Sequence, residues 1–257
     1  MRVTVGLQII PQHGDYEAMK RAWVEADGLG VDRLYNWDHF YPLSGDANGK
    51  HFESLTIQAA MAALTKSAEI SSLVICNSYR NPNLLADMAR TIDHISGGRF
   101  VLGIGSGWFR KDYDEYGYEF GTAGSRLREL DRALPVIKGR WERLNPRPRR
   151  RIPILIGGGG EKVTLRIVAE HADIWHSFGD PATMKRKSDI LDEWCAKVGR
   201  DPAEIQRSTT VARLSGDISR AEDYLELGFT DFVVTAQGPE WDLEPLRKVL
   251  AWRDRLV

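Results

Sequence analysis

Asp38 and His39 stand side by side in the segment Asn36–Phe40, written NWDHF, and place a carboxylate next to an imidazole. An imidazole can take up and release a proton near neutral pH, and a carboxylate can hold such a ring in place. The pair therefore predicts general acid–base chemistry, with His39 as the group that exchanges the proton. From these residues alone, a surface pair without a function stays open as the alternative.

Three alternating glycines precede two aromatic residues in the segment Gly103–Phe109, written GIGSGWF. Glycine lets a backbone approach a ligand closely because it has no Cβ, and aromatic side chains stack on flat rings. The segment is therefore typical of a site for a planar ring system. It does not match the dinucleotide fingerprint, because the third glycine of that motif is missing at the required spacing.

Four consecutive glycines, Gly157–Gly160, come directly before a predicted helix. Their N–H groups, together with the helix dipole, favour an anion, and a phosphate is the natural ligand. A flexible turn is the alternative. A P-loop is disfavoured, because no Lys-Ser or Lys-Thr pair ends the run.

Other polar residues give weaker signals. Asn77 and Ser78 follow a predicted strand and offer hydrogen bonds to a planar heterocycle, whereas the neighbouring Cys76 is typical of a small buried hydrophobe. His176 either lines the mouth of a pocket or packs under a loop. The remaining histidines show no metal-ligand spacing, and we expect no metal; they are His13, His51, His94 and His171.

Short β-branched runs alternate with amphipathic stretches along the whole chain. The predicted strands are Val3–Ile9, Asp32–Trp37, Ile70–Cys76, Phe100–Ile104, Ile152–Ile156, Asp173–Ser177, Arg207–Leu214 and Asp231–Thr235. The predicted helices are Asp15–Leu29, Ser54–Lys66, one through Leu84–Ile95, Leu127–Trp141, Lys162–His171, Met184–Val198, Ala221–Leu227 and Leu243–Arg255. This order predicts an α/β fold, a single (β/α)8 barrel domain over residues 1–257, with the polar motifs at the carboxyl ends of its strands.

Composition narrows the class of protein. The chain has 257 residues and a formal net charge of −1, which argues against nucleic acid as the main partner. No stretch approaches the ~18 apolar residues of a membrane span, the N-terminus lacks a signal-peptide pattern, and two cysteines are too few for a disulfide framework. We therefore expect a cytoplasmic protein that acts on a small molecule. The arginine-rich segment Pro146–Pro153 is interpreted as a solvated connector, with contact to an anionic partner as the alternative.

Together these motifs resemble the luciferase-like monooxygenase superfamily, and within it the group that uses the deazaflavin coenzyme F420. The likeness covers almost the whole chain. It is strongest in the stretches NWDHF at Asn36–Phe40, YRNP at Tyr79–Pro82, the run Leu84–Phe109, PILIGGGG at Pro153–Gly160 and EHADIWH at Glu170–His176.

The resemblance implies a barrel that usually forms a homodimer, with F420, or alternatively FMN, across the strand ends. It implies that Asp38 and His39 flank the ring and the substrate, and that a cis peptide bond supports the ring, most simply at Ser72–Leu73. The cofactor-binding residues implied by position are Asp38, His39, Ser72, Leu73, Asn77, Gly105, Ser106, Gly107, Trp108, Gly157, Gly158, Gly159 and Gly160.

One departure from the family pattern bears on the substrate. F420-dependent sugar-phosphate dehydrogenases place a glutamate directly after the glycines of the fourth strand, where this chain has Trp108. A sugar phosphate is therefore put in doubt, and hydride transfer to or from another small organic molecule is expected. An FMN-dependent monooxygenase and a non-catalytic flavin-binding protein are the alternatives. Lys111 or Arg110 is expected to attract the acidic tail of F420.

Overall fold

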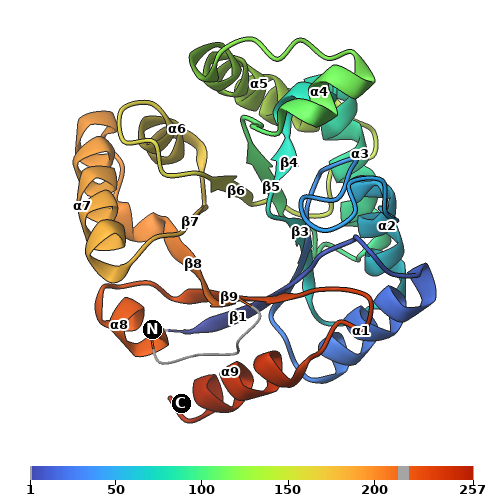
Figure 1. Cartoon of the computed structure of the whole chain (residues 1–257). Coiled ribbons are helices and arrows are strands. Elements are labelled where there is room, and N and C mark those ends of the chain that lie inside the picture. Colours follow the sequence, from blue (N-terminus) through green and yellow to red (C-terminus); the bar gives the residue numbers. More distant parts are fainter. Residues whose placement is uncertain (1, 214–219, 257) are drawn as a thin grey trace.

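Parallel strands close into a barrel with helices around the outside (Figure 1). The computed structural model describes residues 2–213 and 220–256, and within these ranges nine strands form one sheet in the order β3-β2-β1-β9-β8-β7-β6-β5-β4. The strands are β1 Thr4–Ile9, β2 Arg33–Asn36, β3 Glu69–Ser72, β4 Ile75–Cys76, β5 Leu102–Gly105, β6 Ile154–Gly157, β7 Ile174–Ser177, β8 Gln206–Arg213 and β9 Asp231–Ala236. The predicted (β/α)8 barrel is confirmed.

The predicted third strand, Ile70–Cys76, is split into β3 and β4, so nine short strands build an eight-stranded barrel. A cis peptide bond joins Leu73 to Val74 in the interruption. The expected position, Ser72–Leu73, was therefore wrong by one residue. The barrel closes at this place, because Ile70 bridges Phe100 and β4 pairs in parallel with β5.

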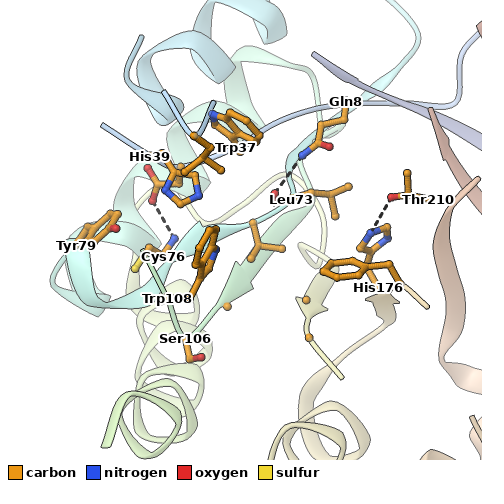
Figure 2. Close-up of a pocket in the computed structure, with 18 residues that line it drawn as sticks. Gln8, Trp37, His39, Leu73, Cys76, Tyr79, Ser106, Trp108, His176 and Thr210 are labelled. Carbon is orange, nitrogen blue, oxygen red and sulfur yellow. Dashed lines mark hydrogen bonds between the residues drawn. The ribbon is translucent and has the colours of Figure 1, made fainter. Parts of the chain in front are cut away.

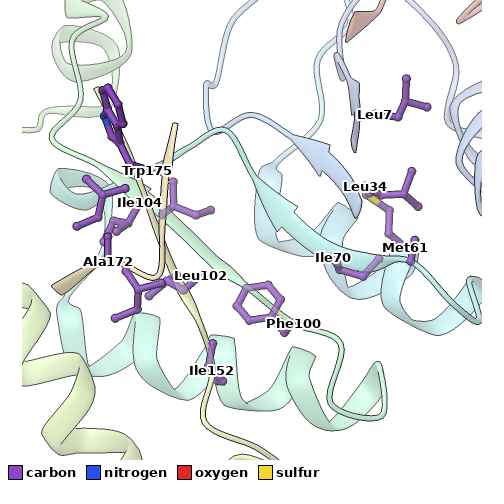
Figure 3. Packing of buried hydrophobic residues seen from close by; sticks show 14 of the residues in the cluster. Leu7, Leu34, Met61, Ile70, Phe100, Leu102, Ile104, Ile152, Ala172 and Trp175 are labelled. Atoms are coloured by element: carbon purple, nitrogen blue, oxygen red, sulfur yellow. The ribbon is translucent and has the colours of Figure 1, made fainter. Parts of the chain in front are cut away.

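Strand residues alternate between the barrel interior and the layer of helices. The outer positions, such as Leu34 and Ile70, join the large core together with Met61 of the helix α2 (Ser54–Leu64) (Figure 3). The inner positions form a small apolar cluster that includes Tyr35 and Val101. Both layers exclude water, as expected for a sheet that is covered by helices.

Most predicted helices are confirmed, although several begin earlier than the hydrophobic pattern indicates. The remaining helices are α1 Tyr16–Gly28, the 3₁₀ helix η1 Asn77–Tyr79, α3 Pro82–Ile95, α4 Arg110–Tyr116, α5 Ala123–Arg143, α6 Thr164–His171, α7 Pro181–Val198, the 3₁₀ helix η2 Pro202–Glu204, α8 Ala221–Glu226 and α9 Glu244–Asp254. The short polar helix α4 was not predicted, because seven residues are too few to show a period. Leu214, the last residue of one predicted strand, lies outside the described residues.

The arginine-rich connector enters β6 at the amino end of the barrel, away from the predicted site. Arg150 pairs with Glu69 at 2.8 Å, and Arg151 pairs with Asp173 at 2.8 Å. These ion pairs support the interpretation of a solvated connector. Among the described residues, no helix is long and apolar enough to cross a membrane.

Candidate functional site

A cavity of about 390 Å³ opens at the carboxyl ends of the strands (Figure 2). Most of the predicted cofactor-binding residues line it, and these are Asp38, His39, Leu73, Gly105, Ser106, Gly107, Trp108, Gly157 and Gly158. Ser72, Asn77, Gly159 and Gly160 are not among its described lining residues. The barrel thus gathers residues that lie far apart in the chain.

His39 is held by a carboxylate that the sequence did not reveal. Its Nδ1 lies 2.7 Å from Oδ2 of Asp112, which belongs to α4 and is fully buried. The same carboxylate accepts hydrogen bonds from the Phe40 N–H at 3.1 Å and the Tyr79 hydroxyl at 3.1 Å. An ionised carboxylate only accepts, so Nδ1 of His39 is the donor and Nε2 is left for proton exchange.

Aromatic rings surround His39 on three sides. The ring centroids of Trp37, Trp108 and Phe109 lie 5.6, 5.8 and 5.4 Å from that of His39. Trp37 also donates from Nε1 to Nε2 of His51 at 3.0 Å. Burial and the nearby His39 lower the pKa of His51 to about 4, so His51 stays neutral and acts as an acceptor that orients Trp37.

Asp38 lines the cavity, but its carboxylate contacts Arg80 and the Cys76 N–H and not His39. Its oxygens accept from Arg80 at 2.5 and 2.9 Å and from the Cys76 N–H at 2.9 Å. Burial raises the pKa of Asp38, while the Arg80 hydrogen bonds act in the opposite direction. Burial alone would lower the pKa of Arg80, but Asp38 and Glu53 more than offset this effect. The residue that positions His39 is therefore Asp112, and Asp38 fastens β4 to the end of β2.

The glycines of β5 and β6 make room for the β3–β4 connection. A Cβ at Gly103 would collide with the Ser72 carbonyl oxygen. A Cβ at Gly105 would lie 2.6 Å from the Val74 side chain, and one at Gly157 would lie 2.8 Å from it. The space beside these glycines is therefore taken by the protein itself: Gly105 and Gly157 seat Val74, and Leu73 and Val74 form part of the cavity wall. Contact of these glycines with a ligand stays a prediction.

The four-glycine run divides between two cavities. Gly159 and Gly160 line a neighbouring cavity of about 610 Å³, together with Lys187 of α7. The N–H of Gly158 is already used, because it donates to the His176 carbonyl at 3.0 Å. Within the described chain, the N–H groups of Gly159 and Gly160 have no acceptor. An added Cβ at Gly159 would collide with Nζ of Lys187, so this ammonium lies close to the Gly159 backbone.

Four other predicted residues lie elsewhere. Ser72 is buried and bonds the Asn36 carbonyl at 3.3 Å, and Asn77 lines a separate cavity beside α5. Lys111 donates to the Ala47 carbonyl at 3.1 Å, and Arg110 pairs with Asp114, a neighbour on α4, at 3.6 Å. The expected attraction of a cofactor tail by Lys111 or Arg110 therefore gains no support, since both are engaged on α4 and the loop beside it.

Sequence reasoning missed Asp112, Lys187 and Val74. Asp112 carries the best available signal, because it is an acidic residue in the first turn after a glycine–aromatic segment. Lys187 gives no signal, since it is one of several lysines and arginines in α7. The structure also brings together Asp131, Glu170 and His171, a cluster that sequence spacing did not predict. Arg166 donates to the Asp131 carboxylate at 2.7 Å and to the Glu170 carboxylate at 2.6 Å.

Comparisons with known proteins agree with the fold. An uncharacterized protein of Mycobacterium tuberculosis is 29% identical over 244 residues, which cover 82% of this chain and 80% of the relative. An F420-dependent secondary alcohol dehydrogenase, solved with an F420–acetone adduct, superposes with a TM-score of 0.85 at 16% identity, covering 97% of this chain and 98% of that one. The oxygenating component of 3,6-diketocamphane monooxygenase from Pseudomonas putida, solved with FMN, gives a TM-score of 0.71 at 16% identity, covering 97% and 96%.

The two solved structures share the fold with this chain. The family itself is shown by sequence, because the model of the luciferase-like monooxygenases matches residues 3–238. The chain is therefore a member of the luciferase-like monooxygenase family of oxidoreductases.

Proposed function

We propose that the chain is an F420-dependent oxidoreductase that transfers a hydride between the deazaflavin and a small organic substrate. The observation that carries the proposal is His39, an imidazole on the cavity wall whose Nδ1 is held at 2.7 Å by the fully buried Asp112. A buried carboxylate that fixes the tautomer of a histidine is the arrangement of an acid–base catalyst.

The residues present fit such a cofactor. Leu73 and Val74 offer an apolar surface for the ring, and Val74 is wedged between Gly105 and Gly157. Gly159 and Gly160 line a cavity that Lys187 also lines, and the Lys187 ammonium lies close to the Gly159 backbone. Backbone N–H groups beside an ammonium suit a phosphate. The two cavities are lined by adjoining glycines of the same run, Gly157 and Gly158 in one and Gly159 and Gly160 in the other.

When bound, F420 supplies a carrier of two electrons as hydride. In the oxidation of an alcohol, Nε2 of His39 would take the hydroxyl proton while the cofactor would supply the acceptor for the hydride, so that a carbonyl would be left. Asp112 stabilises the imidazolium so formed. Reduction of a carbonyl reverses both transfers, with His39 as the acid.

An uncharged substrate suits the described part of the cavity lining, in which apolar and uncharged polar side chains prevail. Trp108 stands where the related sugar-phosphate enzymes carry an acid, and 63% of it is exposed at the rim. The F420-dependent secondary alcohol dehydrogenase, which matches along nearly its full length, supports the same substrate class.

An FMN-dependent monooxygenase is the second candidate. It is favoured by the fold shared with the FMN complex of 3,6-diketocamphane monooxygenase. In this case the same surface at Leu73 and Val74 would hold FMN, and oxygen would be the co-substrate.

Cofactor titration distinguishes the F420-dependent oxidoreductase from the FMN-dependent monooxygenase. Purified protein is titrated with F420 and with FMN, and binding is followed by fluorescence. Tight F420 binding supports the proposal, and tight FMN binding without F420 binding overturns it. At saturating F420, His39→Ala should lose turnover of secondary alcohols by about 100-fold or more. His94→Ala, at the end of α3, is the matched control; full turnover by His39→Ala would refute the proton role.

A further inference from the structure

The hydroxyl of Tyr79 shares one carboxylate oxygen with the ring of His39. Both side chains line the cavity (Figure 2). Both also contact Oδ2 of Asp112, His39 through Nδ1 at 2.7 Å and Tyr79 at 3.1 Å, whereas Oδ1 accepts from the Phe40 N–H. Because the acid–base role of His39 is part of the proposed function, an inference about the second donor rests on that function.

The hydrogen bond from Tyr79 has only one possible direction. An ionised carboxylate only accepts, so the hydroxyl must be the donor. Burial raises the pKa of Tyr79 well above its usual value of 10.0, and the neighbouring Cys76 and Asp112 raise it further. The hydroxyl therefore keeps its proton throughout the range around neutral pH and donates it to Asp112.

The ring of Tyr79 is held by its neighbours, so its hydroxyl has a fixed place. The ring centroids of Phe40, Tyr113 and Tyr118 lie 4.8, 5.2 and 5.2 Å from that of Tyr79. Tyr79 is only 5% exposed, and Asp112 is fully buried. Packed rings of this kind have little freedom to turn away, and water has no access with which to replace the hydroxyl at the carboxylate.

Two donors on one oxygen compete for its charge. The hydrogen bond from Tyr79 stabilises the negative charge on Oδ2 of Asp112. The same oxygen then attracts the Nδ1 proton of His39 less strongly than it would alone, and it stabilises an imidazolium less. The ring of His39 therefore releases a proton more readily with Tyr79 in place than without it.

We propose that Tyr79 is a positioning residue for proton transfer: through Oδ2 of Asp112 it limits how firmly His39 holds its proton, so that the ring can act in both directions of the reaction. Without this donor, His39 is a stronger base. It takes a proton from an alcohol as before, but it returns the proton to a carbonyl less readily.

Other titratable or charged side chains lie on the elements packed around His39, and they are His13, Asp38, His51, Glu53, Cys76, Arg80, Lys111 and Tyr113. Asp38 and Glu53 are paired with Arg80. His51 is neutral, because burial and the nearby His39 lower its pKa to about 4. Within the described ranges, none of these side chains donates to the carboxylate oxygen that His39 contacts.

Proton and nitrogen NMR of histidine-labelled protein, recorded without cofactor, reads this hydrogen bond directly. Tyr79→Phe keeps the ring and removes the hydroxyl, which leaves Oδ2 of Asp112 to His39 alone. The Nδ1 proton of His39, assigned by its loss in His39→Ala, should then move downfield, because its hydrogen bond becomes shorter and stronger. A proton that does not move, or that moves upfield, overturns the proposal.

Tyr118→Phe is the matched control, because it makes the same change in a ring that stacks on Tyr79. In the described part of the chain, the Tyr118 hydroxyl makes no hydrogen bond to Asp112, so the Nδ1 proton of His39 should stay in place. An equal movement in both variants would assign the effect to ring packing and overturn the proposal.

The pH profile of F420-dependent alcohol oxidation gives a second readout. Oxidation needs a neutral His39, so the pH at which kcat/KM reaches half of its maximum should rise in Tyr79→Phe by roughly 0.4–1 unit, the value of one net hydrogen bond. An equal loss at every pH without such a rise would show a structural role only and overturn the proposal. Failure of F420 to bind would sink the proposed function alone, and an unmoved Nδ1 proton would sink this inference alone.

Discussion

Asp112→Asn should disable His39 while leaving the barrel folded. The wild-type carboxylate accepts from three donors: Phe40 N–H reaches Oδ1, and both the His39 ring and the Tyr79 hydroxyl reach Oδ2. An amide group has one oxygen and one NH2. Whichever way the introduced amide is turned, its NH2 faces a former donor, and the negative charge beside His39 is gone.

The magnitude follows from the burial of this site. If the NH2 faces Phe40, a part-buried N–H loses its acceptor; if it faces His39, the ring must switch to the Nε2–H tautomer. A buried donor without a partner costs about 1–3 kcal/mol, which for a chain of this size lowers Tm by roughly 2–12 °C. Turnover should fall by about 100-fold or more, the usual contribution of general acid–base catalysis.

Three measurements on Asp112→Asn check this reasoning: thermal unfolding, F420 affinity and kcat/KM for a secondary alcohol. Cofactor affinity should change little, because Asp112 does not line the cavity. Asp114→Asn is the matched control, since Asp114 lies on the same helix, is 60% exposed and pairs with Arg110 at 3.6 Å. If Asp112→Asn keeps both the Tm and the kcat/KM of the control, the buried carboxylate does not position His39.

Other predictions concern the surroundings of the site. Because burial lowers the pKa of His51 from 6.5 to about 4, the unfolded chain binds a proton between these pH values and the folded chain does not. The free energy of unfolding should therefore fall as pH falls through this window, by up to about 3 kcal/mol, and urea titrations of His51→Gln should lose that slope. Gly105→Ala places a Cβ 2.6 Å from Val74 and should weaken F420 binding by about tenfold or more, reported by fluorescence; unchanged affinity would show that Val74 does not support the ring. Gly139→Ala, within α5 and with nothing near its Cβ position, should stabilise the protein by about 0.5–1 kcal/mol without changing affinity.

Local patterns were sufficient for the barrel. The alternation of β-branched runs with amphipathic stretches follows from a sheet buried on both faces, so it is visible in the chain itself. The same reasoning failed for α4, which is too short and polar to show a period, and at Leu73–Val74, where an apparently continuous strand is interrupted. Asp112 and Val74 lie in these two places.

The sequence by itself determined which segments reach the carboxyl ends of the strands, and hence that His39, Trp108 and Gly157 line one cavity. It also indicated a phosphate site in the glycine run, because helix-start glycines expose N–H groups wherever they occur. These are properties of single segments, set by residue type and order.

Only the tertiary structure decided which side chains meet. Asp112 contacts His39 although the two residues are 73 positions apart in the sequence. Asp38, which directly precedes His39 in the chain, contacts Arg80 instead. Ser208 links His176 to the Asp231 carboxylate, because the register of the parallel strands β7, β8 and β9 places these three residues side by side. Partners of this kind are fixed by strand register and helix placement, which depend on the packing of the whole barrel and leave no local trace in the sequence.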